Sequence, residues 1–174
     1  SGSVDAYLFD MTFDGNQAAH GTTAGEWELR IAQLKVDKFV AEGCHFKNSI
    51  HSAINLTEVE TGAWFNRNTF EGGREDDGTQ GHDTAYILIN GELSSVPDLW
   101  FWENLAEAAL PAIGGRAPAG FLINYDSSTN TNQIRVFFLG NTMINIGQSV
   151  TGVGPPAWDN SQGCIHVYRN TRMC

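Results

Sequence analysis

The sequence predicts a single α+β domain, in which a long N-terminal helix and a second amphipathic helix pack on a mainly antiparallel β-sheet. Two segments carry apolar residues at helical spacing, and several others alternate apolar and polar residues as strands do. No internal repeat or linker divides the 174 residues, and hydrophobic residues make up 41% of them, enough to form a core. We therefore expect one globular domain over 1–174, with Ser1-Gly2-Ser3 as a cloning remnant.

The long helix is predicted over residues 23–60. Thr23 and Glu26 fit a capping box, and apolar residues then recur at intervals of three and four. Gly43 interrupts this pattern, which predicts a break or kink there. An alternative remains open, because the segment 26–31 also alternates as a strand would.

The second helix is predicted after Ser95, which acts as its N-cap with Pro97 in the first turn. Its apolar face consists of Leu99, Trp102, Leu105, Ala106 and Ala109. Trp100 and Phe101 lie off that face and need another surface to cover them. They form either a subunit contact or a second buried helix face.

Alternating segments predict strands over 6–13, 84–90, 120–126, 132–140, 142–150 and 164–169. The polar residues 127–131 separate two of these strands and predict a hairpin between 120–126 and 132–140. The C-terminal third of the chain is therefore expected to be antiparallel sheet.

The charge of −10 argues against nucleic-acid binding and against a polybasic membrane surface. Eighteen of the twenty carboxylates lie in residues 1–110, so the chain has an acidic part and a slightly basic C-terminal part. This split permits head-to-tail self-association, although a solvated acidic surface is the simpler interpretation. No apolar run is long enough to span a bilayer.

The cysteines indicate an extracellular or cell-surface location. Cys164 and Cys174 bracket a short C-terminal segment, and a disulfide between them would attach the tail to the domain. Cys44 is then left over as a small buried hydrophobic residue. The alternative is three reduced cysteines in a cytosolic protein.

An acidic, glycine-rich stretch over 62–84 is a candidate calcium loop, with Glu75, Asp76, Asp77 and Asp83 as its ligands. Because it lacks the alternating D-x-D-x-D-G spacing of calcium loops, a solvated loop is the simpler interpretation. No other cofactor is expected.

No nucleophile elbow, metalloprotease motif or phosphate loop is present, so the sequence favours a protein that is not an enzyme. Spatially paired carboxylates of a hydrolase would not be visible in a sequence. Trp64 and Trp158 lie in expected loops and are candidate contacts for a ligand such as a surface glycan.

Four segments resemble the globular heads of type IV pilin-like proteins, which include minor pilins and pseudopilins. They are FKNSIHSAINLTEVETG, NGELSSVPDLWFWENLAEAALP, APAGFLINYDSSTNTNQIRVFF and GCIHVYRNTRMC. The apolar N-terminal helix of a pilin is missing, and the strand over 6–13 does not belong to the pilin plan. The resemblance implies assembly into a filament, a disulfide-closed tail and no catalysis.

These observations predict an exported, pilin-like subunit of a surface filament or of its adhesive tip, with itself or other filament subunits as partners. The alternative is a secreted ligand- or carbohydrate-binding module that uses Trp64, Trp158 and the acidic loop with calcium. A hydrolase with spatially assembled carboxylates is a third hypothesis.

Overall fold

The structure is a computed structural model that describes residues 4–15, 34–48, 53–72, 85–91, 98–107, 119–125, 134–144, 165–168 and 171–173. All regular elements in these ranges are strands, and all their pairings are parallel. The prediction of an α+β fold with two helices on an antiparallel sheet is therefore wrong. Within the same ranges there is no helix long and apolar enough to cross a membrane.

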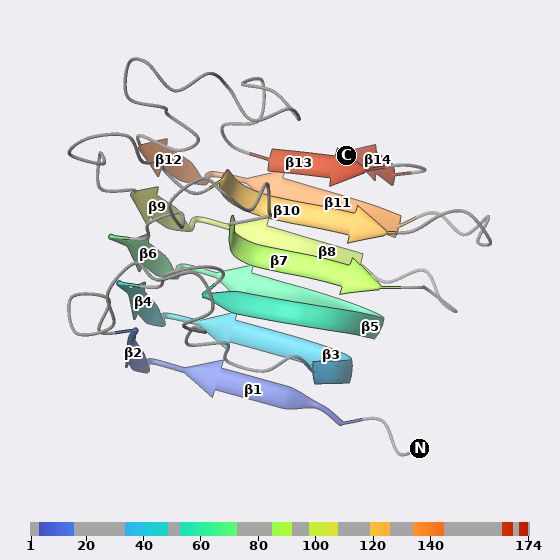
Figure 1. Cartoon of the computed structure of the whole chain (residues 1–174), viewed down its shortest axis with the longest axis horizontal. Helices are drawn as coiled ribbons and strands as arrows, with labels where there is room; N and C mark the ends of the chain where they lie inside the picture. The colour runs from blue at the N-terminus through green and yellow to red at the C-terminus, as the bar shows by residue number, and fades with distance from the viewer. Residues whose placement is uncertain are drawn as a thin grey trace, which may run out of the picture.

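The strands form successive coils of a parallel β-helix, which stack from the N-terminal to the C-terminal end (Figure 1). A nine-stranded sheet contains β1 (Ala6–Phe9), β3 (Leu34–Glu42), β5 (Ile54–Asn66), β7 (Ala85–Gly91), β8 (Asp98–Trp102), β10 (Ala119–Tyr125), β11 (Ile134–Leu139), β13 (Ile165–Tyr168) and β14 (Thr171–Met173). A five-stranded sheet contains β2 (Thr12–Asp14), β4 (His45–Lys47), β6 (Thr69–Glu71), β9 (Leu105–Glu107) and β12 (Thr142–Ile144).

The nine-stranded sheet covers two of the three faces of the coil. The first part of β5 (Ile54–Leu56) pairs with β7, and its last part (Gly62–Asn66) pairs with β8. From β5 onward, β7, β10 and β13 therefore form one face, while β8, β11 and β14 form another. The five-stranded sheet makes the third face, seen at the left of Figure 1.

A bend with positive φ joins the nine-stranded sheet to the five-stranded sheet in each coil. The residues at the bend are Asp10, Gly43, Arg67, Glu103 and Gly140, with φ between 51° and 65°. The amide of each bend residue from Asp10 to Glu103 donates to a carbonyl of the next coil, for example Arg67 N to Trp102 O at 2.8 Å. Hydrogen bonding between coils therefore continues through the bends, and the coils stay in register.

Directly after three of these bends, the side chains of Asn68, Asn104 and Asn141 form a ladder. Asn68 Nδ2 donates to Asn104 Oδ1 at 3.0 Å, and Asn104 Nδ2 donates to Asn141 Oδ1 at 2.8 Å. Each amide also donates to a backbone carbonyl, as Asn104 does to Phe65 O at 2.7 Å. Asn68 and Asn104 are both 1% exposed, so this ladder satisfies polar groups that water does not reach.

Stacked aromatic rings fill the interior. Under the five-stranded sheet, Phe46 stacks between Phe13 and Phe70, with ring centroids 5.1 Å apart on both sides. Under the nine-stranded sheet, Phe65 stacks on Phe101 at the same spacing. Equivalent side chains of successive coils lie about 4.8 Å apart, so parallel rings are a natural way to fill such a core. Cys44 joins this core at 1% exposed, which confirms that it is buried.

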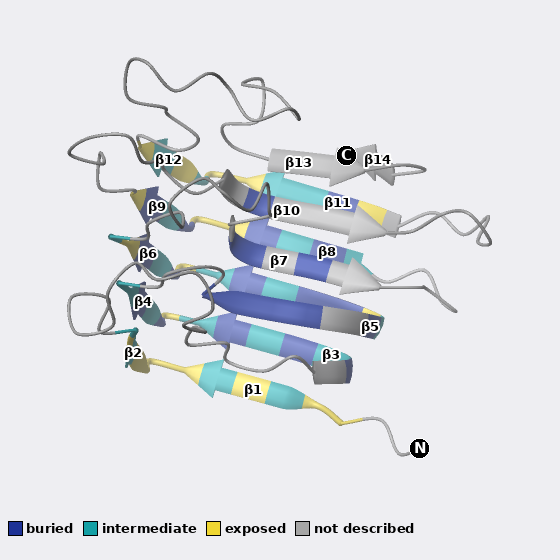
Figure 2. Cartoon of the chain, viewed as in Figure 1, coloured by how far each residue is buried: buried dark blue, intermediate teal, exposed yellow. Residues whose placement is uncertain are grey.

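Burial is deepest in the middle of the stack and falls toward its N-terminal end. Figure 2 shows most of the described side chains of β5 and β7 as buried, whereas β1 alternates between half-buried and exposed residues. Among the described strands, β1 and β2 pair with another strand on one side only.

The bends explain why a helix was predicted over the segment that forms β8 and β9. Leu99 and Phe101 point inward from β8, as does Ala106 from β9. The bend at Glu103 shifts the alternation between these two strands, which turns a period of two into intervals that resemble a helix.

The predicted hairpin between 120–126 and 132–140 is also wrong, although both segments contain strands. β10 pairs with β7 and β13, and β11 pairs with β8 and β14, so neither pairs with the other. In a β-helix each strand pairs with its equivalent in the next coil rather than with its neighbour in sequence. Strands predicted over 84–90 and 164–169 are confirmed as β7 and β13.

Candidate functional site

The outward side of the strands β1, β3, β5, β8 and β11 carries most of the exposed aromatic side chains of the described residues. Register places the outward residues in columns that run along the stack. One column is Tyr7, Val40, Trp64, Trp100 and Phe137, and its neighbour is Phe9, Glu42, Asn66, Trp102 and Leu139. We call these two columns the aromatic face.

Four side chains of the aromatic face are about half exposed: Tyr7 at 48%, Phe9 at 52%, Trp102 at 50% and Leu139 at 49%. Single exposed apolar residues are common on soluble proteins, but neighbouring ones form a patch that typically marks an interaction site. The aromatic face therefore has the composition of a binding surface.

Rings on this face are held by one another and by Lys38. Trp100 stacks on Phe137 with ring centroids 3.8 Å apart. Lys38 Nζ lies 5.0 Å from the centroid of the Trp64 ring and 5.7 Å from that of Tyr7. These cation–π contacts restrict the two rings at little cost, because the ammonium group stays near water.

Tyr7 is neutral at physiological pH. Its hydroxyl donates to Asp5 Oδ2 at 3.0 Å, and this hydrogen bond raises the pKa of the phenol above its usual value of 10.0. Desolvation and the charges of Asp5 and Asp37 act in the same direction.

The Trp64 ring lies over Gly62, where the missing side chain leaves room for it. A Cβ at this position would lie 2.7 Å from Trp64 Cη2 and 2.7 Å from the backbone oxygen of Asp98. We expect Gly62→Ala to destabilise the protein by about 1–3 kcal/mol in urea denaturation, because the Asp98 carbonyl belongs to the pairing of β5 with β8. The double variant Gly62→Ala/Trp64→Ala removes the ring contact but keeps the backbone contact. If the double variant regained full stability, the backbone contact would not be the cause.

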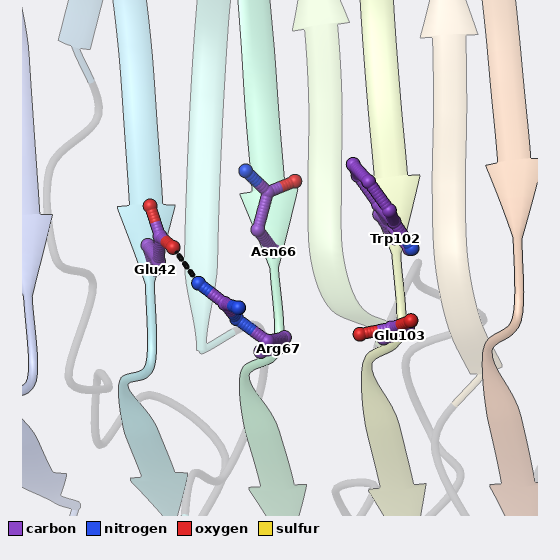
Figure 3. Close-up of a pocket in the computed structure, with 5 residues that line it drawn as sticks. All are labelled: Glu42, Asn66, Arg67, Trp102 and Glu103. Atoms are coloured by element: carbon purple, nitrogen blue, oxygen red, sulfur yellow. Dashed lines mark hydrogen bonds and ion pairs between the residues drawn. The ribbon is translucent and has the colours of Figure 1, made fainter.

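A pocket of about 100 Å³ opens at one edge of the aromatic face, lined by Glu42, Asn66, Arg67, Trp102 and Glu103. Figure 3 looks at it from outside, with Asn66 between Glu42 on one strand and Trp102 on another. The Trp102 ring is seen nearly edge-on, so that one of its faces turns toward Asn66. The smaller Asn66 side chain thus leaves a gap in a column where Trp102 supplies a wall.

The charged residues of the pocket come from the ends of strands and from two bends. Glu42 is the last residue of β3, while Arg67 and Glu103 are the positive-φ residues that follow β5 and β8. Arg67 Nη2 donates to Glu42 Oε1, and the dashed line in Figure 3 marks this ion pair. The bend geometry places these side chains at the rim, where they are partly in water.

The pocket combines one apolar ring face with carboxylate, amide and guanidinium groups. Such a set can stack against the apolar face of a ring while hydrogen-bonding polar groups at its edge. Glycoside hydrolysis uses two carboxyl groups on either side of a bond, but Glu42 is already engaged by Arg67. Binding is therefore the simplest chemistry that this pocket supports.

Of the candidate ligand contacts, Trp64 lies on the aromatic face and is half-buried, while Trp158 lies outside the described residues. Glu75, Asp76, Asp77 and Asp83 also lie outside them, as do Cys164 and Cys174 with their predicted disulfide. In the part of the chain that the structure describes, no group of three His, Cys, Asp or Glu residues could hold a metal ion.

The two residues proposed as a subunit contact point to opposite sides of β8. Trp100 faces outward and stacks on Phe137, whereas Phe101 is 1% exposed and packs in the core. Sequence reasoning did not identify Glu42, Asn66, Arg67, Trp102 or Glu103 as a site. The sequence pattern that could identify these residues is the alternation of inward and outward side chains up to each bend. This pattern can be recognised only when the bends of successive coils are aligned.

Comparison of the chain with family models, with curated proteins and with solved structures finds no match. The aromatic face and its pocket are therefore the features from which a function can be inferred.

Proposed function

We propose that this protein binds carbohydrate without catalysis, through the aromatic face and the pocket beside Trp102. The observation that carries the proposal is the half-exposed ring of Trp102, one face of which lines a pocket together with Glu42, Asn66 and Glu103. Sugar rings present an apolar face to aromatic side chains and hydroxyl groups to polar ones, so both parts of the pocket have a use.

The length of the aromatic face supports an extended ligand. Its columns run over the five strands from β1 to β11, which are about 4.8 Å apart in a sheet. A chain of sugars lying along the stack would meet a new set of side chains at each strand. A rigid sheet also holds these side chains in place before the ligand arrives, which lowers the entropic cost of binding.

The test is affinity electrophoresis against soluble polysaccharides of different composition, followed by titration of Trp fluorescence with oligosaccharides of those that retard the protein. We expect Trp102→Ala to weaken binding about tenfold or more, as buried Trp contacts do in other interfaces. Ile144→Ala is a matched control, because this residue is exposed on the five-stranded sheet. Its binding should equal that of the unmodified protein.

Failure to bind any polysaccharide would contradict the proposal, and so would equal binding by Trp102→Ala. Sedimentation of the same variants tests whether a second copy of the chain, and not a carbohydrate, binds to the aromatic face. If Trp102→Ala turned a dimer into a monomer and left sugar binding unchanged, the aromatic face would be a contact between copies of the chain.

Assembly into a surface filament stays a prediction. The resemblance that suggested it implied helices, and the described residues form none. The cysteines that indicated an extracellular location lie outside the described residues, so that location is also a prediction. Both are compatible with a glycan-binding protein at a cell surface.

A further inference from the structure

The charges around the Trp102 pocket do not cancel. Arg67 forms an ion pair with Glu42, which leaves one carboxylate, that of Glu103. Among the described residues, the Glu103 side chain has no hydrogen bond or ion pair. Its Cγ lies over Gly140, 3.3 Å from where a Cβ of that glycine would be. The pocket therefore carries an excess negative charge at its rim. This charge belongs to Glu103, the residue that follows Trp102 in the chain.

The exposed indole face of Trp102 and the free carboxylate of Glu103 both favour a positively charged ligand group. The face of a Trp ring attracts a cation, and a carboxylate accepts charge-assisted hydrogen bonds from an ammonium group. A ligand carboxylate would instead approach two glutamates, because both Glu42 and Glu103 line the pocket. Arg67 offers it little compensation, since its guanidinium is already paired.

We propose that the Trp102 pocket selects a sugar unit with a free amino group over its N-acetylated counterpart and over a uronic acid. This inference rests on the proposed function and specifies the class of sugar. The sugar ring lies against the face of Trp102 that turns toward Asn66, and its ammonium group donates to Glu103. Asn66 and Glu42 receive the hydroxyl groups.

The experiment compares three oligosaccharides of equal length: a glucosamine oligomer, its N-acetylated form and a uronic acid oligomer. Calorimetric titration at mildly acidic pH keeps the amine charged. We expect the glucosamine oligomer to bind about five- to tenfold more tightly than the N-acetylated form, and the uronic acid oligomer to bind most weakly. The preference should shrink as salt is added, because the pair is near the surface.

The decisive variant is Glu103→Gln, which keeps the shape of the side chain and removes its charge. We expect it to lose most of the preference for the amine, so that the ratio of the two affinities falls toward one, while the Trp102 ring keeps its smaller share of the attraction. Glu107→Gln is the matched control, because Glu107 is exposed at the end of β9 and does not line the pocket. It should behave as the unmodified protein does. Thermal unfolding of each variant confirms that it is folded.

Each other outcome has a definite meaning. Equal binding of the amine and its N-acetylated form overturns this inference and leaves carbohydrate binding standing. A preference for the uronic acid, or an amine preference that is as large in Glu103→Gln as in the unmodified protein, also overturns the inference. No binding of any oligosaccharide, together with no retardation by any polysaccharide, overturns the proposed function itself.

Discussion

Replacing Asn104 by alanine is expected to destabilise the protein by about 2–4 kcal/mol. The Asn104 side chain donates to Phe65 O and Asn141 Oδ1, and it accepts from the amide nitrogen and the side chain of Asn68. Alanine would leave the Phe65 carbonyl and the Asn68 amide without these partners in a region that water does not reach. A buried polar group that loses its partner costs more than an average hydrogen bond contributes.

Urea denaturation followed by circular dichroism measures this effect, and Asn66→Ala is its control. Asn66 is also an asparagine and lies in the neighbouring coil, but it points outward and is half-buried, so its replacement should cost less than about 0.5 kcal/mol. Asn104→Asp provides a second measurement. Its carboxylate lacks the donors that Phe65 O needs, and protonation restores one. The loss of stability in Asn104→Asp should therefore be smaller at acidic pH. Equal stability of Asn104→Ala and Asn66→Ala would show that the ladder adds little.

The strands could be predicted from sequence more readily than their pairing. Alternation identified β7 and β13, as well as the segments of β10 and β11. The order in which they pair could not be read from it, because a β-helix pairs strands that lie a whole coil apart in the chain. A polar segment such as 127–131 is a hairpin signal whether or not the next strand turns back to pair.

The repeat that defines this fold is short and varies in sequence. Aligned on their bends, five segments become comparable: YLFDMTF, VAEGCHF, WFNRNTF, WFWENLA and FFLGNTM. In each segment, inward and outward residues alternate up to one residue with positive φ. Two residues after this bend comes a threonine, a histidine or a leucine. Only three of the five have asparagine after the bend, and chain segments of unequal length separate them. A search for a fixed period therefore finds no repeat.

The same bends limit which residues of the candidate site can be predicted from the sequence. The sequence indicates Trp64 as a candidate ligand contact because it is expected in a loop, whereas in the structure it lies on the outward side of β5. The spacing of Trp102 to Leu99 and Leu105 fits a helix and predicts that Trp102 lies on its buried face. Alternation along β8 instead leaves Leu99 inside and Trp102 outside, and the bend at Glu103 changes the phase only for the residues of β9.

Phe101→Ala is expected to destabilise the protein by about 3–5 kcal/mol, somewhat more than Asn104→Ala. Phe101 is 1% exposed, and its ring centroid lies 5.1 Å from that of Phe65 and 4.8 Å from that of Phe121. Because this ring joins stacks from neighbouring coils, its removal leaves a cavity that a regular sheet cannot close without losing register. Phe101→Leu fills part of that cavity and should cost less.

Urea denaturation of Phe101→Ala and of Phe9→Ala also tests where each ring lies. Phe9 is 52% exposed at the end of β1, so its replacement should change stability by less than about 0.5 kcal/mol. If Phe101 were part of a subunit contact, its replacement would alter the sedimentation of the protein and leave the stability of the folded chain nearly unchanged. A large destabilisation by Phe101→Ala instead means that the inward and outward residues of β8 have different roles. Leu99 and Phe101 hold the coils together, and Trp100 and Trp102 face the solvent on the opposite side of the same strand.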